Sequence, residues 1–135
     1  MTWFVKIELP GLPPTPNSVM AMHWAKKSKL TKRWRRDSYL ACKANGPAPL
    51  GTNVIRVCYT RFSSREPDSD GLAGSFKSIQ DGVTDWVSET NEGFDDRAHQ
   101  LGPAWFWEKA PRGKGRVTVV IVANYEVKGG GVTDG

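Results

Sequence analysis

The pattern of apolar and polar positions along the chain predicts four strands. Alternation at a period of two indicates the first, and runs of β-branched and aromatic residues indicate the others. The predicted strands are Thr2–Leu9, Asn53–Phe62, Gln100–Lys109 and Arg116–Val127. Within the third, Trp105 and Trp107 would share one face. We expect at least one of these indoles in the core, and the alternative is a platform on which bases stack.

Two helices are predicted between these strands. The first is Ser28–Ala44, followed by the helix-ending sequence Asn-Gly-Pro. The second follows Asp70, whose side chain we expect to cap it, because Pro67 keeps the preceding chain extended. An apolar period near 3.6 gives this helix two faces. One is predicted to carry Leu72, Phe76, Ile79 and Val83, and the other Asp70, Gly74, Lys77 and Asp81.

The remaining segments are predicted as loops. Four prolines in Pro10–Asn17 exclude a helix or a central strand and favour a rigid loop. Turns are expected at Pro47–Asn53, at Thr84–Glu92, which is polar, and at Arg112–Gly115, which resembles a hairpin turn. The Gly-rich tail, residues 128–135, is expected to be disordered.

The predicted order is strand, helix, strand, helix, strand, strand. The simplest arrangement is an α+β fold of two layers, in which a small mixed β-sheet carries two helices on one face. At 135 residues the chain has room for one core, so residues 1–127 are predicted to be a single domain.

Composition excludes several classes of protein. The two cysteines have no metal-ligand spacing, which favours buried free thiols in a reducing compartment. No apolar run approaches the length of a membrane span, and the first residues lack the order of a signal peptide. No glycine-rich loop for a nucleotide is found, and no organic cofactor is expected. We therefore expect a soluble cytoplasmic protein with no membrane partner.

The positive charge is concentrated in one segment. The net charge is +5, yet the segment from His23 to Lys43 has eight basic residues against Asp37 alone, which is +7, so the rest of the chain carries −2. A basic helix face is often only solvated. Here three arginines and a near absence of acids favour contact with phosphates. The predicted DNA contacts on this helix are Lys29, Lys32, Arg33, Arg35 and Arg36.

Paired carboxylates precede the second helix. Asp68 and Asp70 are one residue apart, so both would project to one side of an extended chain. Carboxylates this close repel unless a cation neutralises them, and Mg²⁺ is commonly held by one or two carboxylates plus waters. The alternative is that they are only turn and capping residues. A second acidic pair, Asp95 and Asp96, favours the metal site. Asn17 would either cap a turn or contact a phosphate.

These motifs together resemble the RusA-type Holliday junction resolvases over nearly the whole chain. The resemblance rests on Pro13-Pro14-Thr15-Pro16-Asn17, on the basic helix, and on a strand leading into an arginine-containing turn at Arg65. It rests above all on Asp68-Ser69-Asp70-Gly71-Leu72, then Lys77 and Asp81, then Gly93-Phe94-Asp95-Asp96.

The resemblance implies a homodimeric endonuclease that depends on Mg²⁺ or Mn²⁺. Such an enzyme cuts two strands symmetrically across a four-way DNA junction in a bacterial or phage-infected cell. By position, Asp68, Asp70 and Asp96 match the family's catalytic and metal-binding carboxylates, and Lys77 matches its catalytic lysine. Arg65 falls in the DNA-contacting turn.

The chain departs from the family pattern at two positions. Gly71 stands where the family usually has Asn, and Lys77 lies three residues further from Asp70. These departures leave open a DNA-binding relative that has lost catalysis. Two more hypotheses stay open, namely a nuclease that acts on flaps, duplex or RNA, and a purely structural interaction protein.

Overall fold

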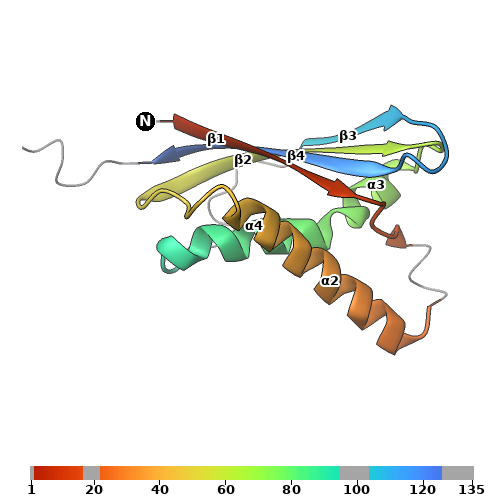
Figure 1. Ribbon diagram of the computed structural model, residues 1–135, viewed down its shortest axis with the longest axis horizontal. Coiled ribbons are helices and arrows are strands. Elements are labelled where there is room, and N and C mark those ends of the chain that lie inside the picture. The colour runs from red at the N-terminus through yellow and green to blue at the C-terminus, as the bar shows by residue number, and fades with distance from the viewer. Residues whose placement is uncertain (1, 17–21, 95–103, 126–135) are drawn as a thin grey trace, which may run out of the picture.

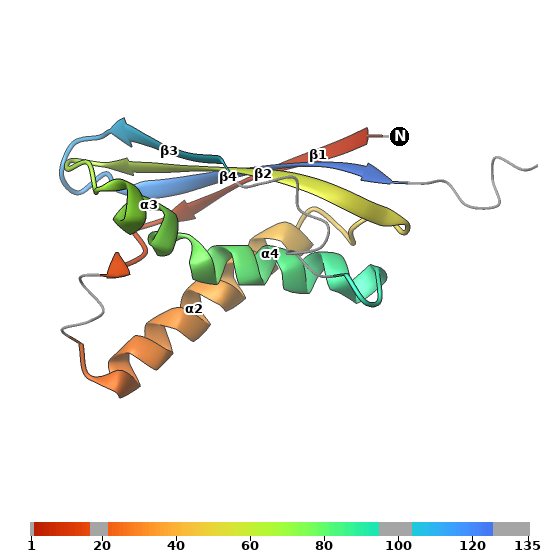
Figure 2. The same cartoon turned by 180° about the vertical axis from the view of Figure 1, so that it is seen from behind.

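A computed structural model of the chain describes residues 2–16, 22–94 and 104–125. Its elements in chain order are β1 (Thr2–Pro10), α2 (Trp24–Lys43), β2 (Thr52–Ser63), α3 (Ser69–Ser75), α4 (Lys77–Thr90), β3 (Ala104–Lys109) and β4 (Arg116–Tyr125). The four strands form one sheet, and helices α2 and α4 cover one of its faces (Figures 1 and 2). The predicted two-layer α+β fold is confirmed at this level.

The sheet is mixed, with the strand order β1-β4-β2-β3. β4 pairs antiparallel with both β1 and β2, whereas β3 pairs parallel with β2. The turn at Arg112–Gly115 is present, with Gly113 at φ +86°. It is no hairpin turn, however, because β3 and β4 are separated by β2. The predicted hairpin is wrong on this point.

One core lies between the sheet and the helices. Side chains on the helix-facing side of the central strands, such as Val57, Tyr59, Val119 and Ile121, are fully buried. Three aromatic rings stack at one end of this core. The ring centroid of Trp105 lies 5.0 Å from that of Tyr59 and 5.7 Å from that of Phe76. Trp105 is therefore partly buried and packs against the core, as expected for one of the two indoles.

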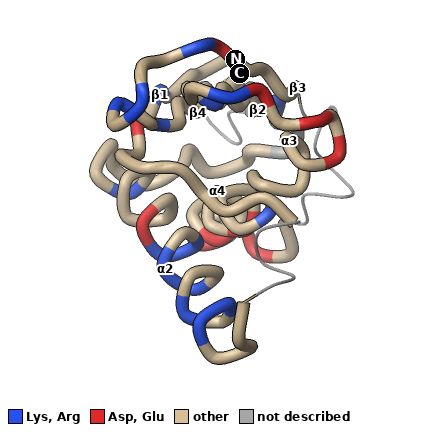
Figure 3. Tube along the Cα trace, turned by 90° about the vertical axis from the view of Figure 1, so that its right-hand side faces the viewer, with Lys and Arg blue, Asp and Glu red and all other residues tan. Residues whose placement is uncertain are grey.

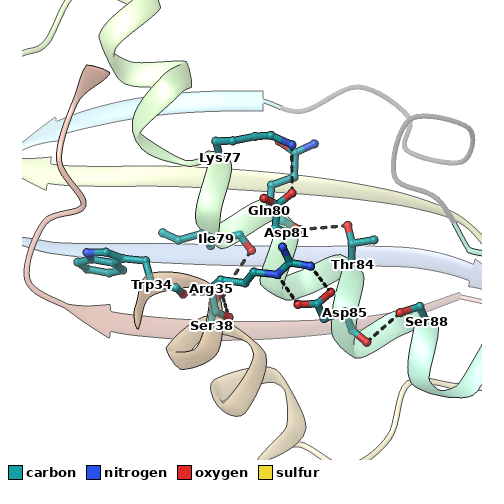
Figure 4. A network of polar contacts seen from close by, with 10 residues as sticks. All are labelled: Trp34, Arg35, Ser38, Lys77, Ile79, Gln80, Asp81, Thr84, Asp85 and Ser88. Atoms are coloured by element: carbon teal, nitrogen blue, oxygen red, sulfur yellow. Dashed lines mark hydrogen bonds and ion pairs between the residues drawn. The ribbon is translucent and has the colours of Figure 1, made fainter. Parts of the chain in front are cut away.

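Helices α2 and α4 approach closely where Gly82 faces Ser38. A Cβ atom at position 82 would lie 2.0 Å from Ser38 Oγ and 2.3 Å from the carbonyl oxygen of Arg35. The Ser38 hydroxyl is buried and bonds the Trp34 carbonyl oxygen of its own helix at 2.8 Å. It also lies 3.4 Å from the Ile79 carbonyl oxygen of α4 (Figure 4). Only glycine fits here without moving a helix.

Two predictions about the second helix are wrong. The segment Thr84–Glu92 is helical as far as Thr90, because Val83, Trp86 and Val87 continue the buried face and the polar residues lie outside it. The helix is also not continuous. It breaks at Phe76 (φ −96°, ψ 0°), so α3 and α4 are separate helices and the described chain has one helix more than predicted in this region.

Helix α2 begins at Trp24, four residues before the predicted start at Ser28, and ends at Lys43. The buried residues are Trp34, Ser38 and Cys42, whereas Ala44 is exposed and caps the helix end. The predicted tail, residues 128–135, lies outside the described residues. No helix among those described is long and apolar enough to cross a membrane.

Candidate nucleic-acid and metal site

The turn that leads out of β2 is fixed by hydrogen bonds around Ser63. Trp107 Nε1 donates to Ser63 Oγ at 2.9 Å, and this hydroxyl donates to the carbonyl oxygen of Arg65 at 2.7 Å. The backbone N–H of Ala110 donates to the Ser63 carbonyl oxygen at 2.9 Å. The end of the parallel strand pair thus fixes the backbone at Arg65, where the chain leaves β2.

Asp68, and not Asp70, caps the following helix. Its side chain accepts a hydrogen bond from the backbone N–H of Gly71, with 2.6 Å between Oδ1 and N, and its backbone is extended (φ −66°, ψ 170°). The helix begins at Ser69, so Asp70 lies within its first turn. The predicted cap at Asp70 and the extended Asp-Ser-Asp tripeptide are therefore wrong. A carboxylate in the first turn remains favourable, because the N-terminal end of a helix carries partial positive charge.

Gly71 lies close to the Asp68 carboxylate. A Cβ atom at position 71 would lie 2.8 Å from Asp68 Oδ1 and 3.7 Å from Pro67 Cβ. A larger residue would have to push the carboxylate away from the N–H group that it caps. The glycine that departs from the family pattern is thus coupled to the orientation of Asp68.

An open cavity of about 290 Å³ lies at this turn. Two arginines line it, Arg61 from β2 and Arg65 from the turn, together with Asp68. The other lining residues are Thr15, Glu66, Pro67 and Gly71. The cavity therefore combines a carboxylate, suited to a hard cation, with guanidinium groups, suited to a phosphate.

Lys77 lies apart from this cavity. Its Nζ is 3.0 Å from Asp81 Oδ1, one turn further along α4. It lines a different groove, which is formed with the proline-rich loop and with Lys27 of α2. In this conformation Lys77 pairs with Asp81, and the groove that it lines does not include Asp68.

The carboxylates predicted to bind a metal lie only partly within the described residues. Asp68 and Asp70 are both exposed at the start of α3. Asp96, the third predicted ligand, lies outside the described residues, as does Asn17. Within residues 2–16, 22–94 and 104–125, no three His, Cys, Asp or Glu side chains are grouped to hold a metal ion. One or two carboxylates completed by waters remain a donor set of the kind that Mg²⁺ accepts.

The basic residues of α2 form the second part of the candidate site. Lys29, Lys32, Arg33, Arg35 and Arg36 are all exposed, as predicted. The N-terminal part of α2 leads away from the sheet, and the basic residues gather there (Figures 1 and 3). Trp24, at its first position, is 75% exposed. His23 caps the helix, since its Nδ1 accepts from the Ala25 backbone N–H at 3.2 Å.

Arg35 differs from its basic neighbours because it joins two helices. Its Nε and Nη2 donate to the two carboxylate oxygens of Asp85 at 2.7 and 2.8 Å (Figure 4). This hydrogen-bonded pair raises the pKa of the Arg35 guanidinium above its usual value. Arg33 and Arg36 each lie 3.6 Å from Asp37, which is a looser contact. Arg33, Arg36 and the nearby lysines are therefore better placed to contact a ligand than Arg35.

Arg61 is the residue at this site that the pattern of the sequence did not single out. It lies on the same face of β2 as Ile55, Val57 and Tyr59, all buried, and is itself only 9% exposed. A signal was present: an arginine continues an alternating row of core-facing apolar residues. A charged residue at such a position is uncommon unless it has a partner.

No protein-family model matches the chain, and no curated protein matches it.

Proposed function

We propose that the protein is a metal-dependent endonuclease that resolves four-way DNA junctions, similar to the RusA-type resolvases. The observation that carries this proposal is the cavity at the end of β2. There, the Asp68 carboxylate and two arginines line one open space of about 290 Å³. Phosphodiester hydrolysis needs a hard cation and a hold on the phosphate, and this cavity offers side chains for both.

The basic part of α2 supports DNA as the substrate. Its exposed lysines and arginines lie along the part of the helix that leads away from the sheet (Figure 3). Such a basic surface contacts backbone phosphates without reading bases, which suits an enzyme that recognises a branched shape. In the proposed complex, Lys29, Lys32, Arg33 and Arg36 contact one arm of the junction, while Arg65 lies near the cut.

Asp68, Asp70 and Asp96 are the proposed ligands of Mg²⁺ or Mn²⁺. A bound cation would generate a nucleophile from water and stabilise negative charge on the phosphate. The chain's own contribution is to orient the Asp68 carboxylate, which the Gly71 N–H holds at 2.6 Å. The proposed role of Lys77 is to neutralise charge that develops on the oxygens of the phosphate. That role requires Lys77 to leave Asp81 when DNA binds.

A homodimer would match the two-fold symmetry of the junction. The outer face of the sheet offers a surface for this association. Phe4 and Val122 are paired neighbours on β1 and β4, and they are 72% and 38% exposed. Phe106 on β3 is 51% exposed on the same face. Exposed apolar side chains concentrated on one sheet face are typical of protein interfaces.

The main competing hypothesis is a junction-binding protein of the same fold that does not cut. The observation that favours it is the position of Lys77, which is paired with Asp81 and lines a groove without Asp68. A nuclease of broader structural selectivity is a second competing hypothesis, and its substrate preference distinguishes it.

The test is cleavage of a synthetic four-way junction in Mg²⁺ or Mn²⁺ and in chelator. Wild type is compared with Asp70→Asn, which keeps the size of the side chain and removes its charge. A linear duplex with the sequence of one arm is the matched substrate control. We expect paired symmetric nicks in the junction, with metal only, and their loss in Asp70→Asn while binding persists.

Three results would contradict the proposal in different ways. Tight junction binding without nicks would indicate the catalytically silent relative. Equal rates on junction and duplex would indicate a broader nuclease. Absence of any salt-dependent DNA affinity would overturn the nucleic-acid proposal as a whole, since phosphate contacts always weaken with salt.

A further inference from the structure

Arg61 is a largely buried cation that makes one hydrogen bond to the described part of the chain. Its Nη1 donates to the carbonyl oxygen of Pro13 at 2.7 Å. A guanidinium has five N–H donors, so four have no hydrogen-bond partner among residues 2–16, 22–94 and 104–125. Among the described residues, no carboxylate lies within ion-pair distance of Arg61. Burial lowers the pKa of Arg61, which is the expected result for a desolvated charge without a counterion.

The single bond to Pro13 does not account for an arginine at this position. Any neutral N–H donor of similar length would satisfy one carbonyl oxygen without the cost of burying a charge. Arg61 also lines the cavity at the end of β2, where Arg65 is a second guanidinium. Buried arginines with free donors at the wall of a polar cavity are suited to a planar or tetrahedral anion.

We propose that Arg61, together with Arg65, forms a subsite for one DNA phosphate beside the Asp68 carboxylate. The inference deepens the proposed nuclease function and rests on it for the identity of the ligand. Arg61 holds the phosphate rigidly, because its side chain is fixed by burial and by Pro13. Arg65 closes over the phosphate from the exposed side. The phosphate would supply the counterion that Arg61 lacks within the described part of the chain.

The subsite also connects the proline-rich loop to the DNA. Arg61 bonds Pro13 of this loop, and Thr15 lines the same cavity. A phosphate on Arg61 would therefore be positioned by β2, by the loop and by the turn at once. Three separate segments of the chain would then fix its distance from Asp68.

The test is the salt dependence of junction binding in chelator, where no cutting occurs. Arg61→Gln keeps an N–H donor for Pro13 and removes the charge, and Arg61→Lys keeps the charge and removes the planar fork. Arg116→Gln is the matched control, because Arg116 lies on the outer face of the same sheet beside Phe62 and Glu8. Thermal unfolding of each variant shows whether it is folded. Arg65→Gln repeats the test at an exposed position, where folding is not at risk.

We expect Arg61→Gln and Arg65→Gln each to weaken junction binding about tenfold at constant salt. The slope of log affinity against log salt should become shallower by about one for each variant. Arg61→Lys should lie between wild type and Arg61→Gln, and Arg116→Gln should match wild type. An unchanged slope and affinity in folded Arg61→Gln, or in Arg65→Gln if Arg61→Gln does not fold, would overturn the proposal.

Two further measurements distinguish a failure of the phosphate-subsite proposal from a failure of the proposed nuclease activity. The slope of log affinity against log salt is measured without metal. It therefore tests the phosphate subsite even if the protein binds the junction and does not cut it. Inorganic phosphate is the second probe. If it raises the melting temperature of wild type and not of Arg65→Gln, while the DNA slope is the same in both, the ligand is a small phosphate. That result would overturn the assignment to DNA.

Discussion

The guanidinium of Arg35 binds the carboxylate of Asp85 through two parallel hydrogen bonds, of 2.7 and 2.8 Å, across the interface of α2 and α4. Both side chains are partly exposed, so solvent screens the pair and its stabilisation is modest. In a double-mutant cycle of Arg35→Gln and Asp85→Asn, we expect a coupling free energy of about 0.5–1 kcal/mol from chemical denaturation. It should shrink at high salt. A coupling of zero would mean that the pair adds nothing to the stability of the interface.

The ion pair of Arg35 with Asp85 predicts which basic residues of α2 contribute more to junction binding. Lys32 lines the same groove as Arg35 and is exposed, with no ion pair to a described residue. Lys32→Gln should therefore weaken junction binding more than Arg35→Gln does, measured by titration at one salt concentration. Equal losses would show that Arg35 leaves Asp85 for the DNA.

Gly82→Ala should disrupt the packing of α2 on α4. The new methyl group would meet Ser38 Oγ and the Arg35 carbonyl oxygen, and a backbone atom has little freedom to move. We expect the free energy of unfolding to fall by about 2–3 kcal/mol, although alanine favours helix more than glycine. Thr84→Ala on the same helix is the control, with an expected change within about 0.5 kcal/mol. A stabilised Gly82→Ala would contradict the close approach of the helices.

Two substitutions at Asp68 separate its capping role from its proposed chemistry. Asparagine caps a helix about as well as aspartate. Asp68→Asn should therefore keep the free energy of unfolding of wild type and lose metal-dependent cleavage. Asp68→Ala should lose the cleavage and, in addition, about 1 kcal/mol of stability. Chemical denaturation and junction cleavage measure the two effects. Full cleavage by folded Asp68→Asn would exclude Asp68 as a metal ligand.

The two free cysteines should react at very different rates. Burial raises the pKa of the Cys42 thiol to about 12, and Cys42 is fully buried. At pH 8 only about one Cys42 in ten thousand would be a thiolate, which is the reactive form. Cys58 is half-buried. A disulfide reagent should therefore modify one thiol in the native protein and two in denaturant, and rapid modification of both would contradict the buried position.

Phe4→Lys should weaken the proposed homodimer. The substitution places a charge on the outer face of the sheet, where Phe4, Val122 and Phe106 are exposed. Sedimentation should then give a higher dissociation constant than for wild type. Leu50→Lys is the control, because Leu50 is equally exposed, at 74%, but lies in the turn before β2. A monomeric wild type would remove the dimer from the proposal.

The strands and the basic helix follow directly from the sequence, because their patterns are local. Alternation predicted the start of β1 correctly and its end to within one residue. A run of β-branched and aromatic residues predicted both ends of β2 to within one residue. The pairing of β3 with β2 did not follow. Which strands become neighbours depends on long connections and on shared burial, and neither leaves a local pattern.

The candidate site was only partly predictable, because capping competes with other roles for the same residues. Asp68 and Asp70 are equally good caps by type, and the start of the helix at Ser69 decided between them. The break at Phe76 was not predicted, and Lys77 is the first residue of a separate helix, where it pairs with Asp81. Arg61 was not singled out, because its hydrogen-bond partner, Pro13, lies in a loop that is distant in sequence.

The central position of β4 has a consequence for how the protein is made. β4 is the last described strand, yet it lies between β1 and β2 and pairs with both. When β1, β2 and the helices have been synthesised, the strand that pairs with both β1 and β2 has not yet been synthesised. The nascent chain must therefore wait, with β-prone segments exposed, until residue 125 emerges. Folding is then limited by contacts between distant parts of the chain, such as that of Thr2 with Asn124. Any message cut short before Arg116 would yield an aggregation-prone fragment in place of a smaller domain.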